Sequence, residues 1–195
     1  MLEKILQTDQ KILVFLNGFH NSFFDVLMWW MTKIWLWLPI LALILWFLWK
    51  YYKKKIWLIL AFLALSIVFS DQISGFIKDG VARSRPSHNT EINHLLHLHT
   101  FKNGDVYKGG KYGFVSSHAA NSFSIILLFI YFFKPICKRA RWLLMLFPFV
   151  FSYTRIYLGI HYLGDILGGA LVGICCGFFT LWLYYLSEKN IAISR

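Results

Sequence analysis

The chain has 195 residues, of which 58% are hydrophobic, 19% aromatic and only 15% charged. A soluble domain is typically about 45–50% apolar and about 25% charged, so this composition excludes a disordered protein, a disulfide-stabilised mini-protein and an ordinary soluble enzyme. The net charge is +11, although the apolar residues lie in long uncharged blocks. This pattern predicts a membrane-embedded protein with its charges in the connections.

Residues 12 to 31 form the first and weakest apolar block, because Asn17, His20 and Asp25 interrupt it. We interpret it as a spanning helix with a polar inner face, and the alternative is a helix that lies in the membrane interface. The clearer blocks, each near the length that crosses hydrocarbon, are 34 to 49, 56 to 77, 117 to 133, 142 to 160 and 163 to 186. The chain is therefore expected to form one domain, residues 1 to 195, folded as an all-α bundle of about six transmembrane helices.

Lysine and arginine are distributed unevenly between the two ends of these blocks. One end receives twelve of the 20 Lys and Arg residues, and the other, which contains the long connection from about 78 to 116, receives eight. The twelve include Lys4, Lys11, Lys138 and Arg195. Because cytoplasmic loops are enriched in Lys and Arg, the count predicts that both termini are cytoplasmic and that the long connection faces outward.

Three segments at this outer end contain nearly all the ionisable groups that adjoin helix ends: 78 to 86, 115 to 118 and 154 to 165. In the third segment, His161 and Asp165 are four residues apart, so on a helix they share a face and can form a hydrogen bond. The second ring nitrogen of His161 would then be free to act as a nucleophile or base. By itself this pair fits a structural helix cap as well as a catalytic site.

The other two segments supply groups that bind anions. Ser116 and Ser117 open a helix, where backbone N–H groups and hydroxyls can bind an anion, and His118 follows directly. Taken alone, a serine-rich helix start is more often structural. The cations of the first segment, Lys78, Arg83 and Arg85, would alone fit a basic cluster at the lipid headgroups.

Because helix ends cluster in a bundle, the three segments are expected to meet at one place on the membrane surface. Cations at that density need an anion between them. A phosphate group suits both guanidinium groups and helix-start amides.

The order and spacing of these residues resemble the three-part signature of the type 2 phosphatidic acid phosphatase superfamily. That signature is Lys-x6-Arg-Pro, Pro-Ser-Gly-His and Ser-Arg-x5-His-x3-Asp, and this chain matches it at the positions Lys78, Arg85, Pro86, Ser116, His118, Arg155, His161 and Asp165. The chain has Val115, Ser117 and Thr154 where the family usually has Pro, Gly and Ser. For Ser117 two explanations are open: a backbone geometry that tolerates a side chain, or a hydroxyl that joins the phosphate site.

The resemblance implies a metal-independent phosphatase that needs no cofactor. In such an enzyme His161, oriented by Asp165, attacks phosphorus to form a phosphohistidine, and His118 is the general acid and base. The residues that would bind the phosphate are Lys78, Arg85, Ser116, Ser117 and Arg155. Arg83 would support these residues or contact the headgroup. The spacing of His94, His97 and His99 fits no zinc motif, and their loop is expected to be a lid or a substrate-facing segment.

The resemblance also implies a lipid phosphate as the substrate, hydrolysed at the outer, periplasmic face of a bacterial inner membrane. Undecaprenyl diphosphate ranks first, ahead of phosphatidylglycerophosphate and lipid A. The alternatives of another class are a lipid phosphotransferase and a non-catalytic protein that binds or transports lipid phosphates. No nucleic acid partner is expected, and no feature of the sequence predicts an oligomeric state.

Overall fold

The computed structural model describes residues 1–134 and 139–193, and every named element within them is a helix. Lys138 and Arg195, which entered the charge count, lie outside the described residues. The α-helices are α1 (Leu2–Asn17), α2 (Ser22–Met31), α3 (Ile34–Tyr52), α4 (Ile56–Val81), α5 (Ser117–Phe133), α6 (Ala140–Leu144), α7 (Leu146–Tyr157) and α8 (Leu163–Ile193). Three 3-10 turns join them: η1 (Lys53–Lys55), η2 (Pro86–His88) and η3 (Asn93–Leu95).

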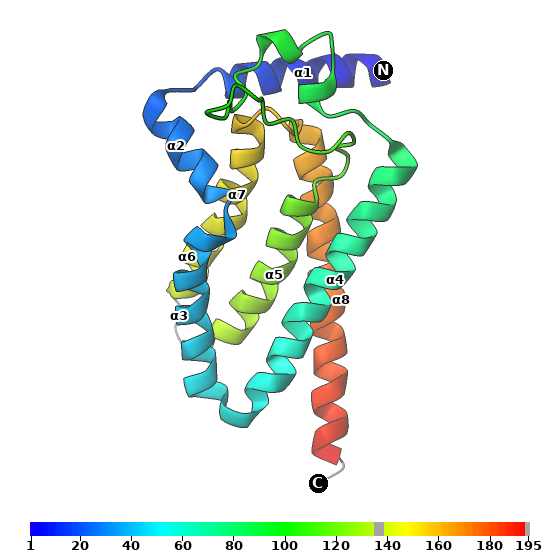
Figure 1. The fold of residues 1–195 in the computed structure, drawn as a ribbon. Coiled ribbons are helices and arrows are strands. Elements are labelled where there is room, and N and C mark those ends of the chain that lie inside the picture. The colour runs from blue at the N-terminus through cyan, green and yellow to red at the C-terminus, as the bar shows by residue number, and fades with distance from the viewer. Residues whose placement is uncertain (135–138, 194–195) are drawn as a thin grey trace.

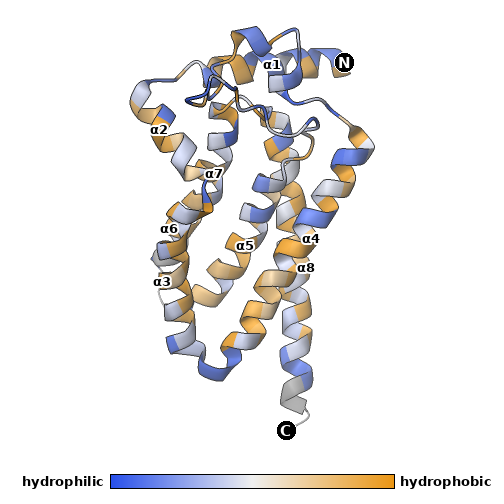
Figure 2. Ribbon diagram, in the orientation of Figure 1, coloured by the Kyte–Doolittle hydropathy of each residue, from blue (hydrophilic) through white to orange (hydrophobic). Residues whose placement is uncertain are grey.

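The long helices have the length and composition of membrane spans. α3 and α4 form a hairpin that turns at η1 (Figure 1) and belong to the apolar stretch Ile34–Val81, and α8 contains a second such stretch, Leu163–Asn190. The apolar helices Ser117–Phe133 and Trp142–Tyr157 are shorter. Hydrophilic residues gather at the α3–α4 turn and at the opposite end of the bundle (Figure 2). The prediction of an all-α membrane helix bundle is therefore confirmed.

The first apolar block is divided between two helices. α1 and α2 meet at a bend of 114°, and α2 begins after Asn21, whose side chain accepts a hydrogen bond of 2.9 Å from the backbone N–H of Phe24. Residues 12 to 31 therefore do not form the single helix that the sequence predicts, but are part of a bent helix pair that has the form of a broken span or a re-entrant segment.

Asn17 explains why the chain turns here. Its side chain is 1% exposed and donates a hydrogen bond of 2.6 Å to the carbonyl of Tyr157, while its amide oxygen accepts one of 2.7 Å from the backbone N–H of His97. A buried amide must satisfy its donors and acceptors, and Asn17 does so by joining the end of α1 to the end of α7 and to the connection between α4 and α5.

The two termini lie at opposite ends of the bundle (Figure 1). α1 lies across the end where α8 begins, and Asp9 holds it there by accepting a hydrogen bond of 3.0 Å from the backbone N–H of Gly164. The structure therefore does not bring the two termini to one end of the bundle, as the prediction of two cytoplasmic termini requires. Lys4 and Lys11 move to the end that contains the long connection, and the predicted excess of Lys and Arg at the other end disappears.

Close packing of α8 on α5 fixes the positions of two site segments. Gly169, Gly173 and Gly177 recur every fourth residue on α8, and a Cβ atom at either of the first two would collide with the backbone carbonyl of Ser116 or of Ala120. Small residues at this spacing allow helices to approach closely in membranes. The beginning of α5 therefore lies directly against the beginning of α8.

Candidate active site

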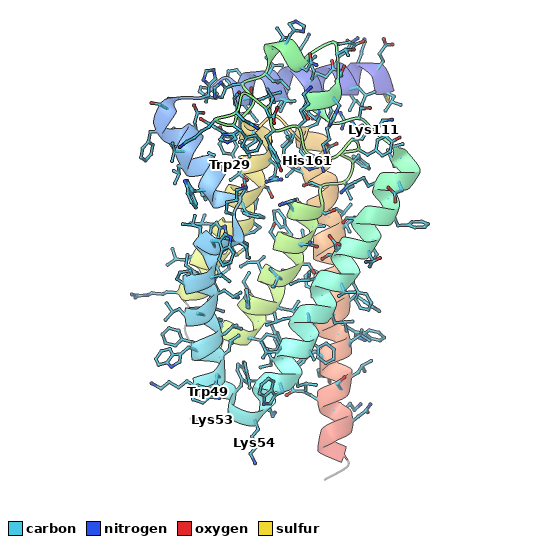
Figure 3. The ribbon with its side chains drawn as sticks, viewed as in Figure 1. Trp29, Trp49, Lys53, Lys54, Lys111 and His161 are labelled. Carbon is cyan, nitrogen blue, oxygen red and sulfur yellow. The ribbon has the colours of Figure 1, made fainter. Side chains whose placement is uncertain are left out.

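His161 lies at the end of the bundle that carries the long connection (Figure 3), and Asp165 lies beside it. His161 is 1% exposed and Asp165 is fully buried. Nδ1 of His161 lies 3.3 Å from Oδ2 of Asp165, and the backbone N–H of Tyr162 donates a hydrogen bond of 3.1 Å to the same oxygen. Nε2 of His161 is buried and has no hydrogen-bond partner among the described residues. This is the arrangement of an oriented imidazole with one free nitrogen.

Arg83 holds the other side of the Asp165 carboxylate. Its Nη1 donates a hydrogen bond of 2.8 Å to Oδ1 of Asp165, and its Nη2 donates one of 2.9 Å to Asp9 on α1. The guanidinium also lies over the ring of Tyr162, at 3.9 Å from the centroid. Arg83 therefore contacts the orienting carboxylate, as the sequence suggested for a supporting residue, and in addition ties α1 to the site.

Lys78 comes from the last turn of α4 and points at the start of α5. Its Nζ donates a hydrogen bond of 2.9 Å to Oγ of Ser117, and the hydroxyl of Ser74 donates another of 2.9 Å to the same oxygen. Ser117 is the first residue of α5 and has a helical backbone, so a side chain in place of glycine causes no strain there. Both explanations left open by the sequence therefore agree with the structure, since the backbone tolerates a side chain and the hydroxyl contacts Lys78.

Ser116 is fully buried as the N-cap of α5. Its hydroxyl oxygen accepts a hydrogen bond of 3.4 Å from the backbone N–H of Ala119, and its own backbone N–H donates one of 2.9 Å to the carbonyl of Asp165. The Ser116 amide is therefore already occupied. Anion binding at this helix start would depend on its hydroxyl hydrogen and on the later N–H groups of the turn.

Two arginines complete the basic part of the site. Arg155 is 2% exposed, its Nη2 donates a hydrogen bond of 3.4 Å to the hydroxyl of Tyr107, and its Nε has no partner among the described residues. Arg85 donates from Nε to the carbonyl of Tyr112 at 2.9 Å. A Cβ atom at Gly109 would lie 2.6 Å from Nη1 of Arg85, so the connection passes directly over this guanidinium.

The cations surround His161. Burial is the main cause that lowers the pKa of His161 well below its usual value of 6.5, and the positive charges of Arg85, Arg155 and Lys78 lower it further. His161 is therefore neutral at physiological pH, which is the protonation state of a nucleophile.

His118 lies on the first turn of α5, near the positive charges of Arg155, Arg85 and Lys78. It lines a cavity of about 330 Å³ together with residues of α4 and α7, among them Ile67 and Phe151. The three segments that the sequence singled out thus converge on one site. A general acid at His118 would therefore lie beside the cavity between α4, α5 and α7.

Several residues of the site were not found from the sequence. Asp9 was not singled out, because no local pattern distinguishes it from a solvated acid. Tyr107 and Gly109 belong to the long connection, and only its length, which is typical of functional loops, draws attention to them. For Tyr162, the only feature of the sequence that could have indicated a place in the site is that it directly follows His161.

The three histidines of the connection have separate surroundings. Nε2 of His97 lies 2.9 Å from Oδ1 of Asp25, His99 stacks on the ring of Trp29 at 3.9 Å, and His94 is exposed. Within the described part of the chain, no group of three or more His, Cys, Asp and Glu residues has a geometry that could hold a metal ion.

Comparison with known proteins places this site in a family context. A family model described as the PAP2 superfamily matches residues 59–189. The chain is 40% identical to a lipid A 4'-phosphatase of Bacteroides thetaiotaomicron over 197 residues, which cover 98% of this chain and 82% of the relative. It is 31% identical to a lipid A 4'-phosphatase of Porphyromonas gingivalis over 193 residues, which cover 97% of this chain and 78% of the relative.

A solved structure shares the fold. The first transmembrane PAP2 type phosphatidylglycerolphosphate phosphatase from Bacillus subtilis matches with a TM-score of 0.68 at 19% identity, and the match covers 95% of this chain and 87% of that one.

Proposed function

Because this chain belongs to the PAP2 superfamily and is an integral membrane lipid phosphatase, we propose that it removes the 4'-phosphate of lipid A through a phosphohistidine intermediate, without a metal ion. The sequence alone ranked undecaprenyl diphosphate first and lipid A last among three substrates. The relatives do not support that order, since both are lipid A 4'-phosphatases that align over nearly the whole chain.

The observation that carries the proposal is the state of His161. One nitrogen adjoins a carboxylate that Arg83 fixes from the other side, and the second nitrogen is buried and unpartnered beside several cations. A non-catalytic lipid-binding or transport protein would need the cations but not a free, neutral and oriented imidazole. A nucleophile needs both.

In the proposed reaction, Nε2 of His161 attacks phosphorus and the bond from phosphorus to the sugar oxygen breaks. His118, which enters this step protonated, donates a proton to that oxygen and becomes neutral, and a lipid with a free hydroxyl leaves. His118 then takes a proton from water, which attacks the phosphohistidine and releases inorganic phosphate and neutral His161. Lys78, Arg85 and Arg155 would hold the phosphate oxygens as charge develops on them, with the hydroxyls of Ser116 and Ser117 as further donors.

The site is proposed to face the periplasm of a bacterial inner membrane. Some cations at the catalytic end belong to the site, and because the site accounts for them, they are left out of the count that predicts topology. They are Lys78, Arg83, Arg85 and Arg155. Without them, the end at the α3–α4 turn, with its run Lys53 to Lys55, is again the more basic one. By the positive-inside rule that end is cytoplasmic.

The proposal is tested by phosphate release from purified lipid phosphates in excess chelator. The panel comprises lipid A, undecaprenyl diphosphate, phosphatidylglycerophosphate and phosphatidate. We expect the highest kcat/KM for lipid A, loss of only the 4'-phosphate, and no turnover by a folded His161→Ala variant. An active His161→Ala variant, or activity that requires an added metal, would contradict the mechanism, and a clear preference for another lipid would contradict the substrate.

The same assay separates hydrolysis from phosphotransfer. A phosphotransferase would use the same first half-reaction, so candidate sugar and lipid acceptors are added and the products are analysed. Inorganic phosphate as the sole phosphorylated product is expected. Labelled phosphate found on an acceptor would identify a transferase.

A further inference from the structure

A second cavity, of about 350 Å³, adjoins the catalytic end of the bundle. It lies between α2, the segment 97–100 and the end of α7, and we call it the α2 pocket; its lining includes Asp25, Trp29, Trp30, His97, Thr100 and Tyr157. A volume of this size is within the range of small-molecule sites, which is about 300–1,000 Å³. Figure 3 shows that Trp29, on this pocket, and His161 lie at the same end of the bundle, away from Lys53 and Lys54.

One side chain connects the α2 pocket to the phosphate site. The hydroxyl of Tyr107 accepts the hydrogen bond of Arg155, and the ring of Tyr107 packs edge-on against Trp29 with 5.2 Å between centroids. Trp29 is in turn held by His99, which stacks on it at 3.9 Å, and by Nζ of Lys33, which lies 3.8 Å from its centroid. Two contacts therefore join Arg155 to the lining of the pocket, through Tyr107 and Trp29.

The polar groups of the pocket form a fixed network. Oδ1 of Asp25 accepts a hydrogen bond of 2.7 Å from the hydroxyl of Tyr157 and lies 2.9 Å from Nε2 of His97. Both contacts end on Oδ1, so Oδ2 makes no hydrogen bond within the described part of the chain. The side chains of Asp25 and His97 are 31% and 36% exposed, so both are open to a ligand.

The charge of the pocket argues against a second phosphate. Among the described residues that line it, none is Lys or Arg, and one is a carboxylate. Asp25 would repel an anion, whereas a hydroxyl group of a ligand would donate a hydrogen bond to Oδ2 of Asp25. Trp30 adds an indole ring that is 54% exposed. Exposed indole beside fixed hydrogen-bonding groups suits a sugar ring, which has apolar C–H faces and a polar edge.

We propose that the α2 pocket binds the uncharged part of a glycosidic headgroup, namely a sugar ring of the lipid substrate, while its phosphate lies at His161. This inference deepens the proposed function and rests on it for the identity of the sugar. The pocket thus distinguishes glycolipid phosphates from glycerolipid phosphates, which have no ring to place there.

The test uses Trp30→Ala in the full-length chain, because Trp30 is exposed and belongs to no catalytic contact. Trp35→Ala is the matched control, since Trp35 is also on an apolar helix, is 72% exposed and does not line the pocket. We expect Trp30→Ala to lower kcat/KM for lipid A about tenfold, which is about 1.4 kcal/mol, with phosphatidate hydrolysis unchanged. Trp30→Phe should recover part of the loss, and Trp35→Ala should behave as the unaltered protein.

A binding measurement that does not depend on turnover separates this inference from the proposed function. The phosphate-free, acyl-free glucosamine disaccharide is added to the detergent-solubilised protein, and saturation-transfer NMR detects contact. We expect contact that Trp30→Ala abolishes and Trp35→Ala preserves.

If the disaccharide binds in this way but lipid A is not hydrolysed, the proposed function fails and the pocket stands. If lipid A is hydrolysed but Trp30→Ala equals Trp35→Ala in both assays, the pocket inference is overturned. Absence of both binding and lipid A hydrolysis overturns both.

Discussion

At the scale of single residues, the site depends on groups that hold Asp165 in place. The carboxylate is fully buried and is held by Arg83, by His161 and by the backbone N–H of Tyr162. The unpaired charge of a buried carboxylate is costly, so all these contacts are needed together. The orientation of His161 is therefore a property of several residues from different parts of the chain.

The pH dependence of activity follows from the low pKa of His161. The proposed nucleophile is neutral His161, and burial and the surrounding cations keep its pKa well below 6.5. After correction for the second ionisation of the substrate phosphate, we expect kcat/KM to fall only when the pH drops well below 6.5. Arg85→Gln removes a positive charge beside His161, so its acid limb should move to higher pH. An acid limb at or above 6.5 in the unaltered protein would contradict this assignment.

Gly113 is required because it leaves space for Asp165. A Cβ atom there would lie 2.8 Å from Oδ2 of Asp165 and 3.2 Å from Cγ of Arg85. We expect Gly113→Ala to displace the carboxylate and to lower kcat by tenfold or more. Gly110→Ala is the control, since a Cβ atom at Gly110 meets nothing within 4 Å. Equal kcat values for the two variants would show that the position of Asp165 does not limit the rate.

At the scale of elements, α1 lies across the catalytic end of the bundle and is bonded to two other segments there. Asp9 joins it to Arg83 at 2.9 Å and to the first turn of α8 at 3.0 Å. A carboxylate at the N-terminus of a helix also interacts favourably with the helix dipole. The polar residues of the first block thus serve contacts between elements, and for this reason the block is divided at Asn17.

Loss of the Asp9 charge should weaken the attachment of α1 to Arg83 and to the start of α8. Asp9→Asn weakens the hydrogen bonds to Arg83 and Gly164, and hydrogen bonds to charged groups contribute about 1.5–3 kcal/mol. We expect Tm to fall by several degrees when unfolding is followed in detergent. Glu3→Gln, at an exposed position of the same helix, should leave Tm unchanged. A Tm for Asp9→Asn equal to that control would show that α1 is not held by this residue.

At the scale of the whole molecule, the catalytic end is defined by α1, by the connection between α4 and α5, and by the starts of α5 and α8. The α3–α4 turn and the C-terminal end of α8 lie at the other end (Figure 1). The two termini are therefore at opposite ends of the bundle. The orientation proposed above rests on the basic α3–α4 turn.

Protease protection of terminal tags tests this topology. In spheroplasts we expect protease to remove a tag fused to the N-terminus, whereas a tag at the C-terminus should be removed only after lysis. Protection of both tags would support the topology inferred from the sequence and would contradict the placement of α1. The reverse result would place the catalytic end in the cytoplasm.

The sequence by itself determined the membrane-embedded helical class, because long uncharged blocks have no other stable environment. It also predicted the three segments that hold Lys78, His118 and His161, because a reactive group and its orienting partner recur at fixed local spacings. Only the tertiary structure decided where α1 lies, that Asp9 and Arg83 fix Asp165, and that Ser117 pairs with Lys78. These contacts join residues far apart in the chain, and nothing in local periodicity specifies which distant side chain satisfies a buried charge.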